Sequence, residues 1–430
     1  MSLNKYDSSL YKVVVSHYTI AAIFFLALAI LFAFSMGDLS GHYFQPKLLA
    51  ITHAAALGWG TMIIFGALTQ LLPVILEREL FSIELCWISL LFFVPGVILL
   101  VYSFWVFDPG MYMQLSGLLV LVAIITFSMN VFLTVQAKKD HTVFQEFIMT
   151  SCLWLMLTAL LGVLMVYNFR FTFLPKDHLQ FLRLHAHMGV AGWFLMLIIG
   201  VSGKLVPMFL VSRYQKTHLL SISYYLINAA LLMFLIDGYL FGLNWKTYLI
   251  FAVALTGIGF YFYYIFQCYK SRLRKEVDLP MLQTLLSFLL LAACIFVLPF
   301  ILYYHLKNDS HAVNLSVFYG ILIFMGWITA LILGQTFKTL PFIVWVKHYE
   351  HLTGKVKTPL PADLINSTLL RIQFTGFFVF LLGFFAGMLY ASNILKFIGA
   401  GGLITTAAVY CIQVLCLLLH KAKTKDYDHV

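Results

Sequence analysis

The stretch LRLHAHMGVAGWFLMLIIGVSGKLVPMFL, residues 182–210, decides the fold class of this chain. It carries two charged residues, Arg183 and Lys204, in an otherwise uncharged run. A helix of about 20 apolar residues crosses a hydrocarbon core of about 30 Å, so this stretch is long enough to span a membrane. Similar runs recur along the chain, which is 62% hydrophobic and 10% charged. A soluble domain carries roughly 25% charged residues, and this composition excludes one.

We therefore predict an all-α polytopic membrane protein of about twelve transmembrane helices. The spans are predicted at 13–36, 47–73, 83–107, 110–136, 144–168, 179–210, 218–241, 246–269, 281–304, 312–345, 367–391 and 394–420. The six cysteines all lie in these apolar runs without a CxxC pair, which favours packing over disulfides or thiolate sites.

The net charge of +10 is distributed over loops, which indicates a lipid partner and not nucleic acid. Seventeen Lys and Arg residues fall on the side of the two termini and six on the other side. The positive-inside rule then places both termini in the cytoplasm. We expect a multi-pass protein of a bacterial-type inner (plasma) membrane, and we see no cleavable signal peptide.

The stretch 180–210 recurs twice, at 46–76 and at 314–344, with a period of 134 residues and no gap. The matching columns are Gly58-Trp59 with Gly192-Trp193 and Gly326-Trp327, then Gly66 with Gly200 and Gly334, Pro73 with Pro207 and Pro341, and Gln70 with Lys204 and Lys338. The glycines would allow neighbouring helices to approach closely. The prolines are expected near the cytoplasmic ends of the spans, where a lost backbone hydrogen bond costs least.

The repeat falls on the second, sixth and tenth spans, so each unit holds four spans. An even number of spans restores orientation, and three parallel four-helix pseudo-repeats follow, related by an axis along the membrane normal. We place them approximately at 1–140, 141–276 and 277–430, within a single membrane domain covering 1–430.

Three histidines are candidate metal ligands because they fall inside predicted spans. His53 lies in the second span, and His185 and His187 lie in the sixth, roughly one third of the way in from the outer face. Buried imidazoles are costly in lipid unless they are used, and neutral imidazole is a common ligand of haem iron. Arg183, one turn before His187, is a candidate partner for a haem propionate, or else an anchor at the outer headgroups.

The repeat relates two of these histidines. His53 and His187 occupy one column, so a haem between the second and sixth spans could have two histidine ligands. His185 and His187 are two residues apart and face opposite sides of the helix, which suits two separate sites. The third repeat has Tyr319 and Ile321 in the corresponding columns. The plainer alternative is that these histidines hydrogen-bond neighbouring helices and bind nothing.

Lys204 and Lys338 allow two interpretations as well. They snorkel to the cytoplasmic interface, or they belong to a proton or anion path through each unit. Most other histidines fall at span ends or in loops, where solvated or headgroup-level side chains are usual, and His17 near the start of the first span is expected to be one of them.

The stretches 182–210 and ITHAAALGWGTMIIFGALTQLLPVIL at 51–76, with three parallel four-helix units, resemble the haem–copper oxidase superfamily. The resemblance is closest to stand-alone subunit I-like proteins and to NnrS-type membrane haem proteins linked to nitric oxide stress. It implies haem, with a b-type haem as our expectation, His53 as a low-spin haem ligand, and His185 or His187 in the place of a copper ligand.

The chain also departs from the oxidase pattern. The seventh span has no His-His pair, residues 319–321 read Tyr-Gly-Ile in place of HxH, and no tyrosine follows the histidines of the sixth span at the oxidase spacing. A standard binuclear centre cannot be assembled from these residues, so neither copper nor dioxygen reduction by that mechanism is supported.

Three hypotheses follow. The chain is a cytochrome-like haem protein for electron transfer or nitric oxide handling, with His53, His187 and His185 as iron ligands and other redox or membrane subunits as partners. Alternatively it is a cofactor-free transporter or channel in which Lys204, Lys338 and Gln70 line the inner mouths. A third hypothesis is an assembly or partner subunit with a vestigial site. No catalytic residue is assigned under any of them.

Overall fold

A computed structural model describes the chain over residues 3–136, 142–273 and 275–422. These residues form helices and no strand, apart from one isolated bridge between Ser212 and Arg272. Twelve of the helical stretches are long and apolar enough to cross a membrane, which confirms the all-α polytopic class. Lys138, Lys139, Arg274, Lys423 and Lys425, which entered the charge count, lie outside the described residues.

The α-helices lie close to the predicted spans. They are α1 (Leu3–Phe34), α2 (Pro46–His53), α3 (Met62–Leu76), α4 (Ile83–Val106), α5 (Met111–Gln136), α6 (Val143–Phe171), α7 (His178–His187), α8 (Met196–Leu210), α9 (His218–Leu240), α10 (Lys246–Lys270), α11 (Leu279–Leu306), α12 (His311–Ile321), α13 (Thr329–Tyr349), α14 (Ser367–Leu389) and α15 (Asn393–Leu418).

Local chemistry explains several helix starts. Pro46 opens α2 at a position where the missing backbone N–H costs nothing. The Ser82 hydroxyl accepts a hydrogen bond from the backbone N–H of Leu85 at the start of α4, at 3.1 Å. Asn366 accepts two such bonds at the start of α14, from Thr368 and Leu369. Side-chain caps of this kind satisfy backbone donors that the helix itself leaves unpaired.

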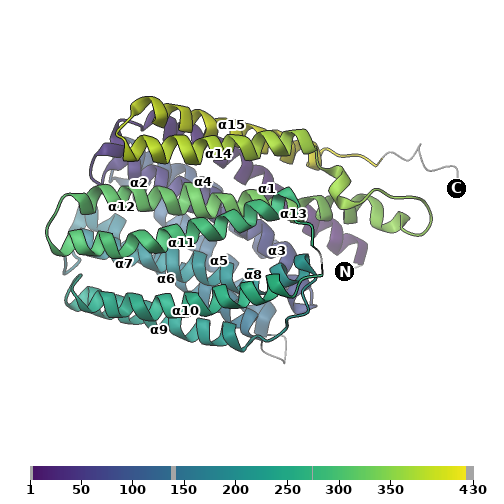
Figure 1. Ribbon diagram of the computed structural model, residues 1–430, viewed down its shortest axis with the longest axis horizontal. Coiled ribbons are helices and arrows are strands. Elements are labelled where there is room, and N and C mark those ends of the chain that lie inside the picture. The colour runs from purple at the N-terminus through teal and green to yellow at the C-terminus, as the bar shows by residue number, and fades with distance from the viewer. Residues whose placement is uncertain (1–2, 137–141, 274, 423–430) are drawn as a thin grey trace. The chain divides into compact units, whose positions relative to one another are not determined.

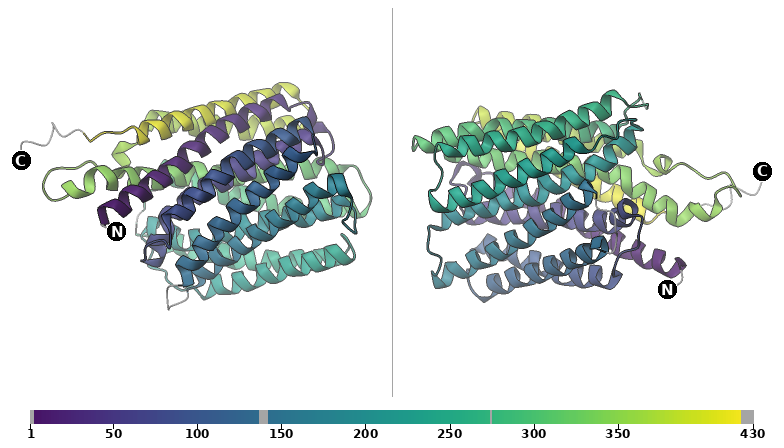
Figure 2. Two further views of the ribbon diagram at one scale, coloured as in Figure 1. Left: turned by 180° about the vertical axis from the view of Figure 1, so that it is seen from behind. Right: turned by 90° about the horizontal axis from the view of Figure 1, so that it is seen from below.

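The chain forms two compact units, which we describe separately. The first unit comprises residues 1–70, 277–297 and 313–430, and the second comprises 71–276 and 298–312. In the first unit α14 and α15 form a hairpin, and α1 packs along α15 (Figures 1 and 2). In the second unit α4 pairs with α5 and α9 with α10, and α6 lies against both α5 and α8.

The same kind of contact links consecutive repeats in both units. The last span of the first predicted repeat, α5, packs on the first span of the second, α6. The last span of the third predicted repeat, α15, packs on the first span of the first, α1. The compact units therefore cut across the 134-residue repeats, because the first and third repeats each pack their last helix on the first helix of another repeat.

The second, sixth and tenth spans each contain a segment of π-helix. The segments are η2 (Ala54–Thr61), η3 (Met188–Leu195) and η4 (Leu322–Ile328). Their first residues, 54, 188 and 322, are 134 apart, in register with the sequence repeat. Such wide turns are rare and often mark functional sites.

The repeat glycines allow close helix approach, as predicted. A Cβ atom added to Gly66 would lie 2.6 Å from Cβ of His17 on α1, and one added to Gly200 would lie 2.5 Å from Cβ of Phe147 on α6. At Gly334 it would lie 2.6 Å from the carbonyl oxygen of Pro280. These distances are shorter than Cβ contacts allow, so each span packs glycine against the first span of its own repeat.

Two of the three repeat prolines end their helices in the same way. The backbone N–H of Arg78 donates to the carbonyl of Pro73 at 3.1 Å, and the N–H of Ser212 donates to that of Pro207 at 2.8 Å. The third differs, because α13 continues past Pro341 and past the predicted end of its span at residue 345, to Tyr349. A proline does not stop a helix whose neighbours hold the following turns in place, and α13 packs on α1 and α15.

Candidate functional site

His53 is the last residue of α2, directly before the π-helical segment η2 in the first unit. Its Nδ1 donates a hydrogen bond to the backbone carbonyl of Leu49 at 2.7 Å. Since a carbonyl oxygen only accepts, the proton is on Nδ1, and in the neutral ring the lone pair is on Nε2. This tautomer is the one in which imidazole binds a metal through Nε2.

His187 repeats this arrangement in the second unit. It is the last residue of α7, directly before η3, and its Nδ1 donates to the backbone carbonyl of Arg183 at 2.8 Å. Its ring lies against Phe234 of α9, with ring centroids 4.5 Å apart. The 134-residue register thus relates residue type, hydrogen bond and place in the span for His53 and His187.

His185 contacts a different helix. Its Nδ1 donates to the backbone carbonyl of Thr158 on α6 at 3.0 Å, and its ring lies against Gly162. A Cβ atom at Gly162 would lie 3.0 Å from Cε1 of His185, so the glycine makes room for the imidazole. His185 contacts α6 and His187 contacts α9, in agreement with their spacing of two residues. The two side chains do not share one site.

The predicted environment of His17 was wrong. The sequence favoured a headgroup-level side chain near the start of the first span, but His17 is 1% exposed. Its Nδ1 donates to the carbonyl of Val13 at 2.8 Å, and its Nε2 is buried without a hydrogen-bond partner. His17 is therefore a buried imidazole that sequence reasoning missed. The signal available was its place one full turn inside an apolar run.

The repeat column of Gln70, Lys204 and Lys338 has different surroundings in different repeats. The Lys338 ammonium forms an ion pair with the Asp278 carboxylate, which directly precedes α11. Lys204, in the same column of the second repeat, is exposed, which agrees with snorkelling. Gln335 also reaches α11, where its Nε2 donates to the Thr284 hydroxyl at 2.8 Å. The first unit therefore has a polar layer between α11 and α13.

Arg183 is partly exposed, and its backbone carbonyl accepts the bond from His187. Its predicted role as a propionate partner stays a prediction.

The described residues contain no group of three His, Cys, Asp or Glu side chains that would hold a metal ion on its own. Haem iron differs from such a site, because the porphyrin supplies four donors and the protein supplies one or two axial ligands. The donor chemistry of His53 and His187 fits that requirement, with a neutral ring fixed by a backbone carbonyl in each case.

No protein-family model matches the chain, and no curated protein shows significant similarity to it. The likeness to haem–copper oxidase subunit I-like and NnrS-type proteins gains no support from these comparisons. The functional argument therefore depends on the side chains themselves.

Proposed function

We propose that this chain is a membrane haem protein in which the Nε2 atoms of His53 and His187 would hold haem iron. The observation that carries the proposal is their shared hydrogen bond, Nδ1 to the carbonyl four residues earlier, at 2.7 and 2.8 Å and 134 residues apart. His17 makes the same local bond, so the bond alone is not distinctive. The shared register before a π-helical segment sets His53 and His187 apart.

The haem would supply the electron or the site for a gas molecule, and the chain would supply ligation and orientation. The carbonyls of Leu49 and Arg183 hold each ring in one tautomer and raise the basicity of Nε2. Two histidine ligands on one iron would favour electron transfer, whereas a single histidine would leave the iron able to bind nitric oxide. His185, with its separate contact to Thr158, is a further ligand candidate on the other side of the helix.

The direct test is the absorption spectrum of protein purified after expression with ample haem, with haem counted as its pyridine haemochrome. We expect a Soret band in the wild type. His53→Ala and His187→Ala should each lower the haem-to-protein ratio at least twofold, or change a low-spin spectrum to high-spin. His218→Ala is the matched control, because His218 is exposed at the start of α9 and should leave the spectrum unchanged.

The double variant separates two arrangements of ligands. If both histidines bind one iron, each single variant keeps one histidine ligand and changes the spectrum from low-spin to high-spin, and only the double variant loses the haem. If they bind separate haems, the losses add. A wild-type protein without a Soret band would contradict the haem proposal altogether.

A second function, ion or proton transport, is favoured by one observation, the ion pair of Lys338 with Asp278 in the first unit. Ionisable residues within membrane segments are costly and often mark ion paths. Proteoliposomes loaded with a pH-sensitive dye would test it. Transport predicts dissipation of an imposed pH gradient that Lys338→Met abolishes, whereas Lys204→Met, at an exposed position, does not.

We further propose a bacterial-type inner membrane with both termini on the cytoplasmic side, supported by the Lys and Arg count of the loops. A haem protein that transfers electrons also requires a redox partner, which would bind at one membrane face.

A further inference from the structure

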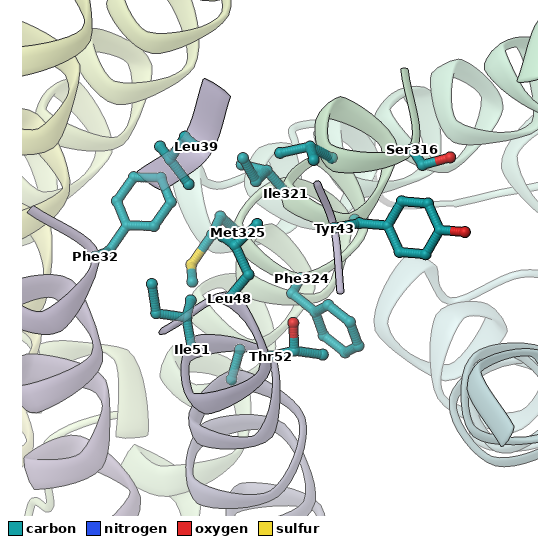
Figure 3. A pocket seen from close by; sticks show the side chains of 13 residues that line it. Phe32, Leu39, Tyr43, Leu48, Ile51, Thr52, Ser316, Ile321, Phe324 and Met325 are labelled. Carbon is teal, nitrogen blue, oxygen red and sulfur yellow. The ribbon is translucent and has the colours of Figure 1, made fainter. Parts of the chain in front are cut away.

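The first unit contains a partly open cavity of about 80 Å³ that the proposed function does not use (Figure 3). It lies between the end of α1, the helix α2 and the junction of α12 with η4. Its apolar walls come from Phe32, Leu39, Leu48, Ile51, Ile321 and Met325.

The chemistry of the lining selects an uncharged occupant. Hydroxyl groups come from Tyr43, Thr52 and Ser316, and none of the described residues that line the cavity is charged. In Figure 3 the hydroxyls of Tyr43 and Ser316 point away from Phe32 and Leu39. A water molecule needs two to four polar partners, so the apolar side of this cavity is unfavourable for water.

The volume of the cavity limits the size of the molecule that can bind in it. Sites for drug-sized ligands measure roughly 300–1,000 Å³, far above this cavity. An engineered apolar cavity of roughly 150 Å³ stays dry and binds benzene or xenon. We propose that the cavity is a binding site for one small uncharged molecule of the size of a dissolved diatomic gas. This proposal does not depend on haem.

The cavity lies where the third repeat differs from the other two in the histidine column. Ile321, in its wall, occupies the column of His53 and His187. Phe324 and Met325, also in the lining, belong to η4, the π-helical segment of the third repeat. The third repeat therefore presents an apolar wall where the other two present an imidazole.

Gly320 is a position at which a larger side chain is expected to fill the cavity. It lines the cavity, and a Cβ atom added to it would meet no atom within 4 Å. The side chain of Gly320→Val would begin in this free space, at a residue that lines the cavity. Gly401→Val is the matched control, because Gly401 also lies in a helix of the first unit with open space at its Cβ but does not line the cavity.

The test uses dioxygen as the probe and the methionine methyl groups as reporters. Protein with ¹³C-methyl methionine is placed in nanodiscs, and methyl relaxation is measured under nitrogen and under raised oxygen pressure. Met325 is 1% exposed and Met62, in the same unit, is 0% exposed. We expect paramagnetic relaxation at the Met325 methyl at least threefold above that at Met62, because Met325 lines the cavity and Met62 does not.

Gly320→Val should reduce the oxygen effect at Met325 to the level of Met62, and Gly401→Val should leave it at the wild-type value. An oxygen effect at Met325 equal to that at Met62 in the wild type would overturn the proposal, as would an effect that survives Gly320→Val. Strong nuclear Overhauser contacts between the Met325 methyl and lipid chain protons would also overturn it, because they would show an acyl chain in the cavity.

Discussion

At the scale of single residues, the chain uses short contacts of glycine to hold its helices together. Gly200 is the clearest case, because a Cβ atom there would lie 2.5 Å from Cβ of Phe147. Side chains forced into a close-packed contact cost typically about 1–3 kcal/mol, because backbone and rotamers must shift.

Gly200→Ala is therefore expected to lower the free energy of unfolding by about 1–3 kcal/mol, measured by chemical denaturation in mixed micelles. Gly401→Ala adds the same methyl group where nothing lies within 4 Å, and should stabilise slightly through helix propensity. Equal stability of the two variants would show that α6 and α8 do not approach as described.

Some properties of the histidines could be predicted from the sequence and others could not. The register of His53 with His187 was readable in the sequence, because a fixed period relates their columns. The hydrogen bonds that fix their tautomers were not, because they depend on rotamers. The place of His17 one turn inside an apolar run indicated a position within the membrane, but its complete burial depends on which helices cover the first span.

At the scale of elements, twelve spans were predictable because length and hydropathy alone identify membrane helices. The π-helical segments were not predicted. The residues of these spans are mostly apolar on every face of the helix, so no sequence period distinguishes a π-helical turn from an α-helical one. The predicted tenth span, 312–345, already passes Pro341, and only the continuation of α13 to Tyr349 was missed, because it depends on packing with other helices.

The link between α11 and α13 gives a prediction at this scale. The side chain of Lys338 is 12% exposed and that of its partner Asp278 is 37% exposed, so water screens the ion pair only in part. Lys338→Met should lower the free energy of unfolding by about 1–3 kcal/mol, because it leaves a half-buried carboxylate without its partner.

Lys204→Met is the control for this prediction, since Lys204 is exposed in the equivalent column and should change stability by less than about 0.5 kcal/mol. A double-mutant cycle of Lys338→Met with Asp278→Asn should give a coupling free energy above zero. Strict additivity of the two changes would exclude an interaction that matters for folding.

At the scale of the whole molecule, the charge distribution makes a prediction about orientation. With both termini in the cytoplasm, the loop that contains Gly110 faces outward and the loop that contains Lys216 faces inward. The side of the membrane that each loop faces can be measured with single cysteines. The six native cysteines are replaced first, and Gly110→Cys or Lys216→Cys is then introduced.

A membrane-impermeant maleimide should label Gly110→Cys in intact cells and Lys216→Cys only after the membrane is opened. The reverse pattern would invert the proposed topology while leaving the twelve spans in place.

The three π-helical segments have a consequence for the history of the chain. A wide turn changes the angular position of every residue that follows it, so it is difficult to gain or lose one without disturbing the rest of the helix. Its recurrence at 54, 188 and 322 is most simply explained if an ancestral four-helix protein already carried it and was then copied twice in tandem. The backbone irregularity would then be older than the imidazoles, which only two of the three copies have today.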